Sequence, residues 1–267
     1  MPNTYTHGHH ESVLRSHRWR TAENSAGYLL PRLEPGMRLL DVGCGPGTIT
    51  MDLAELVGVT GRVTALERTP EALDLAQAEA ERRGTTNVDF AVGDVQSLDL
   101  PDDSFDVVHA HQVLQHVDDP VQALREMARV CRPGGTVAAR DSDYEAFAWH
   151  PAVPELDHWL ELYLQVARSN DAEPAAGRRL LAWAHAAGIA DVTATASTWC
   201  FATPEDRAWW GGLWAERVVH SDLAAQLVGR GFATTRELTR IADGWSRWAE
   251  HDDGWFNVLH GEILATA

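Results

Sequence analysis

The stretch LLDVGCGPGT, residues 39–48, carries the strongest information about the fold of this chain. It joins a short apolar run, typical of a buried strand, to glycines at every second position before a helical pattern begins. Bare backbone between a strand and a helix lets a ligand approach closely, because no Cβ atom stands in the way. A G-x-G-x-x-G dinucleotide fingerprint is not met, since Thr48 replaces the last glycine and Pro46 lacks an N–H donor. The loop therefore favours a cofactor without a phosphate.

Two acidic residues stand near this loop at the ends of predicted strands. Asp41 precedes the first glycine by two positions, and Glu67 follows the second predicted strand, residues 62–66. A carboxylate at the end of the second strand, such as Glu67, can accept hydrogen bonds from both hydroxyls of an unmodified ribose. Nicotinamide and adenosyl cofactors share that ribose, so these residues alone leave both open.

From Arg38 onward, short β-branched runs alternate with helical patterns, which is typical of a parallel sheet covered on both faces. We therefore predict an α/β, Rossmann-like, mostly parallel sheet of seven strands, with helices on both faces. Helix starts are expected at Thr69-Pro70 and at Asp119-Pro120, and a helix end at Gly84. The predicted strands are residues 38–42, 62–66, 88–92, 105–110, 136–140, 191–201 and 254–267.

The expected domain organisation is an N-terminal helical cap, residues 1–36, followed by one cofactor-binding domain, residues 37–267. Two inserted segments, at about 145–172 and 204–252, are predicted to form helices that act as lids over one end of the sheet. Ten of the eleven tryptophans lie between Trp149 and Trp255, mostly in helical patterns.

Composition narrows the function further. The formal net charge is −17, and all 22 basic residues are arginines. The absence of lysine excludes Schiff-base chemistry and a GK[ST] phosphate loop, and the negative charge disfavours nucleic-acid binding. Three widely spaced cysteines fit neither a disulfide framework nor a zinc site. No signal peptide or long apolar run is found, so we expect a cytoplasmic protein that does not enter a membrane.

Five segments together resemble one family, the class I S-adenosylmethionine-dependent methyltransferases, particularly the ubiquinone/menaquinone-biosynthesis type that acts on small molecules. They span residues 38–140 in the order and spacing of that family. The segments are DVGCGPG, ALE, VGDVQSLDLP, FDVVHAHQVLQHV and RVCRPGG.

The resemblance implies a role for each matching residue. Asp41 would orient the amino-acid end of the cofactor, and Glu67 would bind the ribose hydroxyls. Asp94 would accept from the adenine amino group while the Val95 N–H donates to the ring, and His111 would lie beside the sulfonium. Asp41 and Asp94 could instead cap neighbouring backbone amides. The implied cofactor-binding set is Asp41, Gly43, Gly45, Gly47, Thr48, Glu67, Arg68, Asp94, Val95 and His111.

Methyl transfer needs an acceptor held in line with the S–CH3 bond, and no dedicated catalytic residue is strictly required. A carbon, phenol or cationic amine acceptor must lose a proton, so a base of near-neutral pKa would help. His111, His116 and Tyr144 are the candidate catalytic residues; Asp141 and Asp143 follow the fifth strand at the same rim. Each has a structural alternative: His111 can be part of the scaffold, His116 can bond a carbonyl, and Tyr144 can fill the loop.

The candidate substrate-binding residues come from the N-terminal cap and the aromatic insertions. Large rings at helical spacing usually fill a core, but some can wall a flat apolar pocket. The histidines at positions 7, 9 and 10 lack the acidic partner and the fixed spacing of a metal site, so no metal is predicted. The candidates are Tyr5, His10, Trp19, Tyr144, Trp210 and Trp214.

We therefore expect methyl transfer to a small organic acceptor, best an aromatic carbon or heteroatom as in an indole or phenol, with S-adenosylhomocysteine as product. A protein or RNA acceptor is disfavoured by the lack of basic clusters and of an N-P-P-[YF] tetrapeptide. A third alternative is a protein that binds S-adenosylmethionine without transferring methyl. The oligomeric state, monomer or homodimer, stays open.

Overall fold

The computed structural model describes residues 11–267, and they form two compact units. The larger unit comprises residues 17–142, 176–197 and 260–267. In the described part of the chain, the smaller unit comprises residues 11–16, 143–175 and 198–259. We call them the sheet unit and the aromatic unit.

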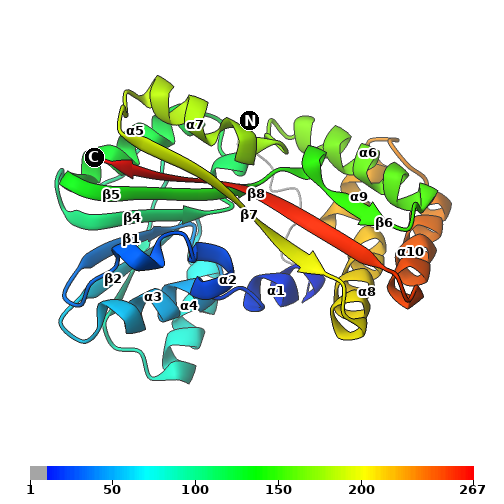
Figure 1. Ribbon diagram of the computed structural model, residues 1–267, viewed down its shortest axis with the longest axis horizontal. Coiled ribbons are helices and arrows are strands. Elements are labelled where there is room, and N and C mark those ends of the chain that lie inside the picture. Colours follow the sequence, from blue (N-terminus) through cyan, green and yellow to red (C-terminus); the bar gives the residue numbers. More distant parts are fainter. Residues whose placement is uncertain (1–10) are drawn as a thin grey trace. The chain divides into compact units, whose positions relative to one another are not determined.

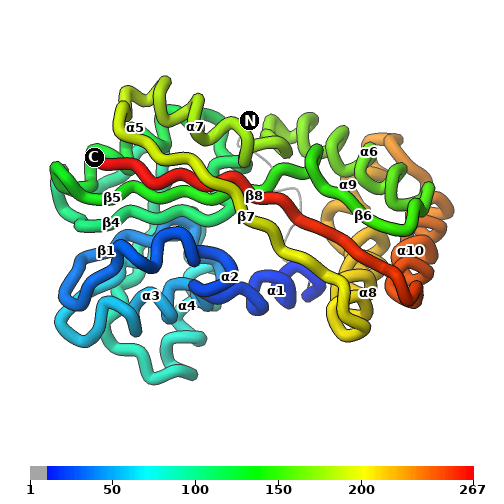
Figure 2. The backbone as a smooth tube through the Cα atoms, viewed as in Figure 1, coloured from blue at the N-terminus to red at the C-terminus, as the bar shows by residue number. Residues whose placement is uncertain are grey.

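The sheet unit is built on parallel strands in the order β3-β2-β1-β4-β5. Strand β8 runs antiparallel to β5, and β7 pairs with β8; Figure 2 shows β7 and β8 side by side. The α/β, Rossmann-like prediction is confirmed. The strands are β1 (Arg38–Val42), β2 (Arg62–Glu67), β3 (Val88–Val92), β4 (Phe105–His111), β5 (Cys131–Ser142), β7 (Val192–Phe201) and β8 (Trp255–Thr266).

Helices cover both faces of this sheet (Figure 1). On one face, α3 packs Leu53 and Val57 against Leu39 and Val63. On the other face, α5 and α7 pack Leu124 and Leu180 into a separate apolar cluster. The helices of this unit are α2 (Ala22–Ala26), η1 (Leu30–Arg32), α3 (Thr48–Val57), α4 (Pro70–Arg83), η2 (Leu114–His116), α5 (Pro120–Val130) and α7 (Ala176–Ala187).

The predicted helix boundaries follow from local capping. Thr69 and Asp119 each accept a backbone N–H of the first turn, with proline at the first helical position. Gly84 ends α4 in the left-handed conformation, φ 69°, where a side chain would add strain. These predictions are confirmed.

One face of the sheet changes from apolar to polar along the strands. Because side chains alternate between faces, residues paired in register share a face. The apolar part of this face includes Leu39, Val107, Ala138 and Leu264, which belong to the cluster under α3. Toward the carboxyl ends of the parallel strands, the same face carries Asp41, His109, His111, Arg140 and Glu262. A buried polar layer therefore lies where ligands bind in parallel sheets.

The aromatic unit is mainly helical. Its β6 pairs antiparallel with residues 255–257 of β8. The sequence analysis missed this short strand: it predicted seven strands, whereas the sheet formed by residues 11–267 has eight. Helices α6 and α8–α10 lie within the two segments predicted as insertions; their action as lids stays a prediction. The elements are α1 (Glu11–Arg18, shared with the sheet unit), η3 (Tyr144–Ala146), β6 (Ala148–His150), α6 (Pro154–Arg168), α8 (Pro204–His220), α9 (Asp222–Gly229) and α10 (Thr235–Glu250).

Tryptophans form the core of this unit. Trp159 lies edge-on to Trp214 and Trp245, with ring centroids 4.5 and 4.9 Å apart. Trp248 and Phe256 complete the same cluster, and all five rings are almost fully buried. Such edge-to-face packing of large rings stabilises a core beyond the burial of area alone. No described helix is long and apolar enough to cross a membrane.

Candidate active site

The loop after β1 places bare backbone next to open space. Its three glycines have positive φ, at 64° for Gly43, 53° for Gly45 and 80° for Gly47. A Cβ built on Gly43 would lie 2.4 Å from a methyl carbon of Val113, so only glycine fits there. A Cβ built on Gly45 would meet nothing within 4 Å. The loop is thus tightly packed below and open at Gly45.

Asp41 is buried at the end of β1 and accepts two side-chain hydrogen bonds. The Thr50 hydroxyl donates to Oδ2 at 2.6 Å, and His109 Nδ1 lies 2.8 Å from Oδ1. With an ionised Asp41, His109 must carry its proton on Nδ1 to donate. The carboxylate is therefore fixed in direction by α3 and β4.

Glu67, at the end of β2, holds the glycine loop from the side. Its Oε1 accepts from the Gly45 N–H at 2.9 Å, and its Oε2 accepts from the Arg68 N–H at 2.9 Å. A carboxylate has about four lone-pair positions, so each oxygen can still accept another donor. Glu67 can tie down the loop and bind two hydroxyls together.

Asp94 caps the turn after β3. Its Oδ1 accepts from the Gln96 N–H at 2.9 Å and from Gln96 Nε2 at 3.3 Å. This is the capping geometry weighed as the alternative for Asp94, and its contact with adenine stays a prediction. The neighbouring Val95 side chain is buried.

The turn after β4 contacts the glycine loop through Val113. The same turn carries the polar side chains of Gln112, Gln115 and His116. His111 ends β4 on the polar face and is buried. Burial, followed by the nearby Arg140 and Arg20 cations, lowers the pKa of His111 well below its usual 6.5. His111 is therefore a neutral imidazole near neutral pH. Gln112, the next residue, has a left-handed φ of 55°.

His116 closes the same turn, and Gln115 links it to β5. The Ser142 hydroxyl donates to Gln115 Oε1 at 2.7 Å, and Gln115 Nε2 lies 3.1 Å from His116 Nε2. Burial, with Arg20 as a smaller cause, lowers the pKa of His116 to about 4. His116 is thus uncharged at neutral pH.

Asp141 supports this turn from β5. Its Oδ1 accepts from the Gln115 N–H at 3.3 Å, and the Leu114 N–H also donates to the carboxyl group. Burial raises the pKa of Asp141 to about 7, although these N–H groups and Arg140 oppose the rise. Oδ2 is buried without a hydrogen-bond partner in residues 11–267. Asp141 acts on the site through the turn it holds.

Arg140 and Glu262 form a buried ion pair in the polar layer, with Nε and Oε1 3.2 Å apart. The Thr195 hydroxyl donates to Glu262 Oε2 at 2.8 Å, and Arg140 also donates to Ser197 Oγ. Sequence analysis missed this pair. Polar residues two apart in the apolar pattern VLHGEIL, at His260 and Glu262, could have indicated it.

Comparisons with known proteins agree with this geometry. A family model described as a methyltransferase domain matches residues 33–198. The chain belongs to this family. An uncharacterized methyltransferase of Schizosaccharomyces pombe is 39% identical to it over 97% of this chain and 95% of its own length. A demethylmenaquinone methyltransferase of Lactococcus lactis is 33% identical over 49% of each chain.

Solved structures share the fold of this methyltransferase. The YcgJ protein from Bacillus subtilis has a TM-score of 0.57 at 21% identity, covering 97% of this chain and 98% of its own. The [4+2]-cyclase SpnF has a TM-score of 0.52 at 22% identity, covering 97% and 88%. The predicted class I, S-adenosylmethionine-dependent methyltransferase is confirmed, and with it the cofactor.

The residues present fit S-adenosylmethionine. A Cβ at Gly45 would meet only open space, the Glu67 carboxylate contacts the Gly45 N–H, and the loop offers backbone rather than a phosphate clamp. Asp41 and Glu67 suit the amino and ribose groups of this cofactor, and Asp94 suits its adenine; these assignments stay predictions. Among residues 11–267, no three His, Cys, Asp or Glu side chains are arranged to hold a metal ion.

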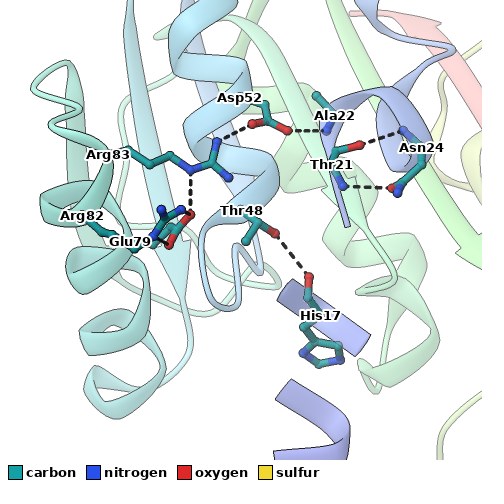
Figure 3. A network of polar contacts seen from close by, with 9 residues as sticks. All are labelled: His17, Thr21, Ala22, Asn24, Thr48, Asp52, Glu79, Arg82 and Arg83. Carbon is teal, nitrogen blue, oxygen red and sulfur yellow. Dashed lines mark hydrogen bonds and ion pairs between the residues drawn. The ribbon is translucent and has the colours of Figure 1, made fainter. Parts of the chain in front are cut away.

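An N-terminal segment is tied to the cofactor loop of the methyltransferase, as Figure 3 shows. The Thr48 hydroxyl donates to the His17 carbonyl at 3.2 Å, and the Ala22 N–H donates to Asp52 at 2.8 Å. Thr48, predicted to touch the cofactor, thus anchors this segment in the structure. Trp19 lies in the same segment, and its carbonyl accepts from Asn24.

Among the other predicted substrate contacts, those that the structure describes fall outside the sheet unit. Tyr5 and His10 lie outside the described residues. Tyr144 stacks on Tyr163 in the aromatic unit, with ring centroids 3.9 Å apart. Trp210 and Trp214 are buried in the same unit. Their contact with a substrate stays a prediction.

Proposed function

We propose that this methyltransferase acts on a small organic acceptor, best an aromatic carbon or heteroatom as in a phenol or indole. The supporting observation is His111: a neutral, buried imidazole at the carboxyl end of β4, in a turn whose Val113 packs on Gly43. The Lactococcus lactis relative, named for demethylmenaquinone, supports a small-molecule acceptor.

S-adenosylmethionine supplies an activated methyl group when bound. The chain's own task is to orient the acceptor, exclude water and remove one proton. A phenol oxygen or ring carbon becomes strongly acidic as it is methylated, so a weak base suffices to take its proton. An ammonium group must lose its proton beforehand, and an imidazole with a depressed pKa is a poor base for that. His111 therefore favours an uncharged aromatic acceptor over a cationic amine.

The test is transfer of labelled methyl from S-adenosylmethionine to a panel of phenols, indoles, amines and aliphatic acids. We expect label on aromatic compounds. Label only on protein or RNA would overturn the proposal. Binding without any transfer would favour the third alternative; a protein named as a [4+2]-cyclase shares this fold.

His111→Ala should lower kcat by about 100-fold or more, the usual contribution of a general base, with little change in affinity for S-adenosylhomocysteine. His158→Ala is the matched control, because His158 is a histidine on α6 with a 42% exposed side chain beside Glu161. Equal kcat in the two variants would exclude His111 as the base.

A further inference from the structure

Two glutamine–histidine pairs frame His111. Gln112 Nε2 lies 2.8 Å from Nε2 of His260 on β8, and Gln115 Nε2 lies 3.1 Å from Nε2 of His116. Both glutamines belong to the turn HQVLQH, residues 111–116. In each pair, the orientation of the glutamine amide decides which ring nitrogen of the histidine can carry a proton.

Arg20 fixes the orientation of the first glutamine. Its Nη2 donates to Gln112 Oε1 at 2.7 Å. A guanidinium group has donors and no acceptor, so the atom facing it must be the amide oxygen. Gln112 therefore presents its NH2 group to His260. Since an NH2 group only donates, His260 Nε2 must be the acceptor, and the ring proton of His260 sits on Nδ1.

In the second pair, Gln115 and His116, the orientation of the amide is not fixed in this way. The partner of Gln115 Oε1 is the Ser142 hydroxyl, which can donate or accept. The Gln115 amide can therefore turn over without losing either contact, and His116 can take either tautomer. Gln115 thus offers an internal comparison for Gln112 within one turn.

We propose that Arg20 and Gln112 are positioning residues, which hold His260 as the neutral Nδ1–H tautomer beside His111. The two histidine rings are stacked with centroids 6.1 Å apart. An imidazolium at His260 would oppose a second positive charge at His111 over this distance. Protonation of His260 Nε2 would break its contact with the Gln112 NH2 group. His111, rather than His260, is therefore the histidine that accepts the proton. The catalytic part of this inference rests on the proposed function of His111 as a base.

The tautomer can be read directly from the resting protein. Two-dimensional ¹H–¹⁵N spectra of protein labelled with ¹⁵N-histidine distinguish a protonated Nδ1 from a protonated Nε2, and His260→Asn assigns the signals. In the wild type we expect His260 to show Nδ1 protonated and Nε2 unprotonated. The reverse pattern would overturn the proposal without any knowledge of the acceptor.

Gln112→Glu is the decisive variant. A carboxylate accepts from both Arg20 and His260, so His260 should gain a proton on Nε2 while the His116 signals stay in place. Gln115→Glu should change His116 and leave His260 as in the wild type. Arg20→Met removes the donor that orients the Gln112 amide, so both tautomers of His260 should be seen. This variant replaces Gln112→Glu as the test if Gln112→Glu fails to fold. Unchanged His260 signals in both Gln112→Glu and Arg20→Met would overturn the proposal.

Kinetics then test the catalytic part. With an accepted substrate, Gln112→Glu should lower kcat by about tenfold or more, while the Kd of S-adenosylhomocysteine stays nearly unchanged. A changed tautomer with an unchanged kcat would show that His260 does not influence the reaction. If no acceptor is methylated at all, the proposed function fails, and the spectra still decide the tautomer.

Discussion

Glu67→Ala tests how the methyltransferase holds the ribose of its cofactor. In the resting protein, the substitution removes the acceptor of the Gly45 and Arg68 N–H groups. Water can replace the contact at Arg68, which is exposed, so the substitution should lower the free energy of unfolding by about 1 kcal/mol. The larger effect is expected on cofactor binding.

The magnitude follows from the hydrogen bonds lost. Two ribose hydroxyls would lose a charged acceptor, and partial hydration would offset part of the loss. A total of about 1–3 kcal/mol corresponds to a Kd that rises by about fivefold to 150-fold. Asp89→Ala is the control, since Asp89 is an exposed carboxylate on the neighbouring β3 that pairs with Arg62. This control should bind the cofactor like the wild type.

Calorimetry with S-adenosylhomocysteine and its 2′,3′-dideoxy analogue separates direct contact from loop disorder. The wild type should bind the analogue more weakly by about the same fivefold to 150-fold, because the analogue lacks both hydroxyls. Glu67→Ala should bind the two ligands with nearly equal affinity. If Glu67→Ala still prefers the natural ligand as strongly as the wild type does, Glu67 does not bind the hydroxyls.

Three further predictions concern the core. Glu262→Gln leaves the Arg140 cation 3.2 Å from an uncharged partner. The lost attraction is about 5 kcal/mol at an effective dielectric of 20, so the free energy of unfolding in urea should fall by about 3–5 kcal/mol. The double variant Arg140→Met with Glu262→Met should restore most of this stability. A double variant as unstable as Glu262→Gln would contradict this prediction. The raised pKa of Asp141, about 7 against about 3.9 when unfolded, means that the folded state binds more protons between these values. The free energy of unfolding should therefore fall as pH rises from about 4 to 7, and Asp141→Asn should remove this contribution; an identical pH profile of thermal unfolding in that variant would refute the assignment. Trp214→Ala should lower the free energy of unfolding by about 3–5 kcal/mol, because it leaves a cavity among buried rings. Trp255→Ala, at a 39% exposed position, should lower it by under about 1 kcal/mol. Similar losses in the two variants in denaturant unfolding would contradict the aromatic core.

The sheet unit could be predicted well from the sequence, because the patterns that specify its elements are local in the chain. The glycine loop, the proline-marked helix starts and the β-branched strands each depend on residues within one turn or strand. Glu67 was placed beside the glycine loop because parallel strands end at one edge of the sheet. These features need no knowledge of distant pairing.

The polar layer could not be predicted in the same way. His260 and Glu262 reach β5 only through an antiparallel register that no short pattern specifies. Likewise, the contact from Arg20 to Gln112 joins positions 92 residues apart. The aromatic core was predicted only in part: helical spacing indicated that large rings usually fill a core, but it could not separate core rings from pocket walls.

The left-handed backbone at Gln112 has a practical consequence for engineering. A non-glycine residue at φ 55° stores strain of about 1–3 kcal/mol, which glycine would relieve. A screen for heat resistance alone would therefore enrich Gln112→Gly, and it would do so by discarding the amide that faces His260. Libraries that aim at a more robust enzyme should keep this codon fixed or select for turnover at the same time.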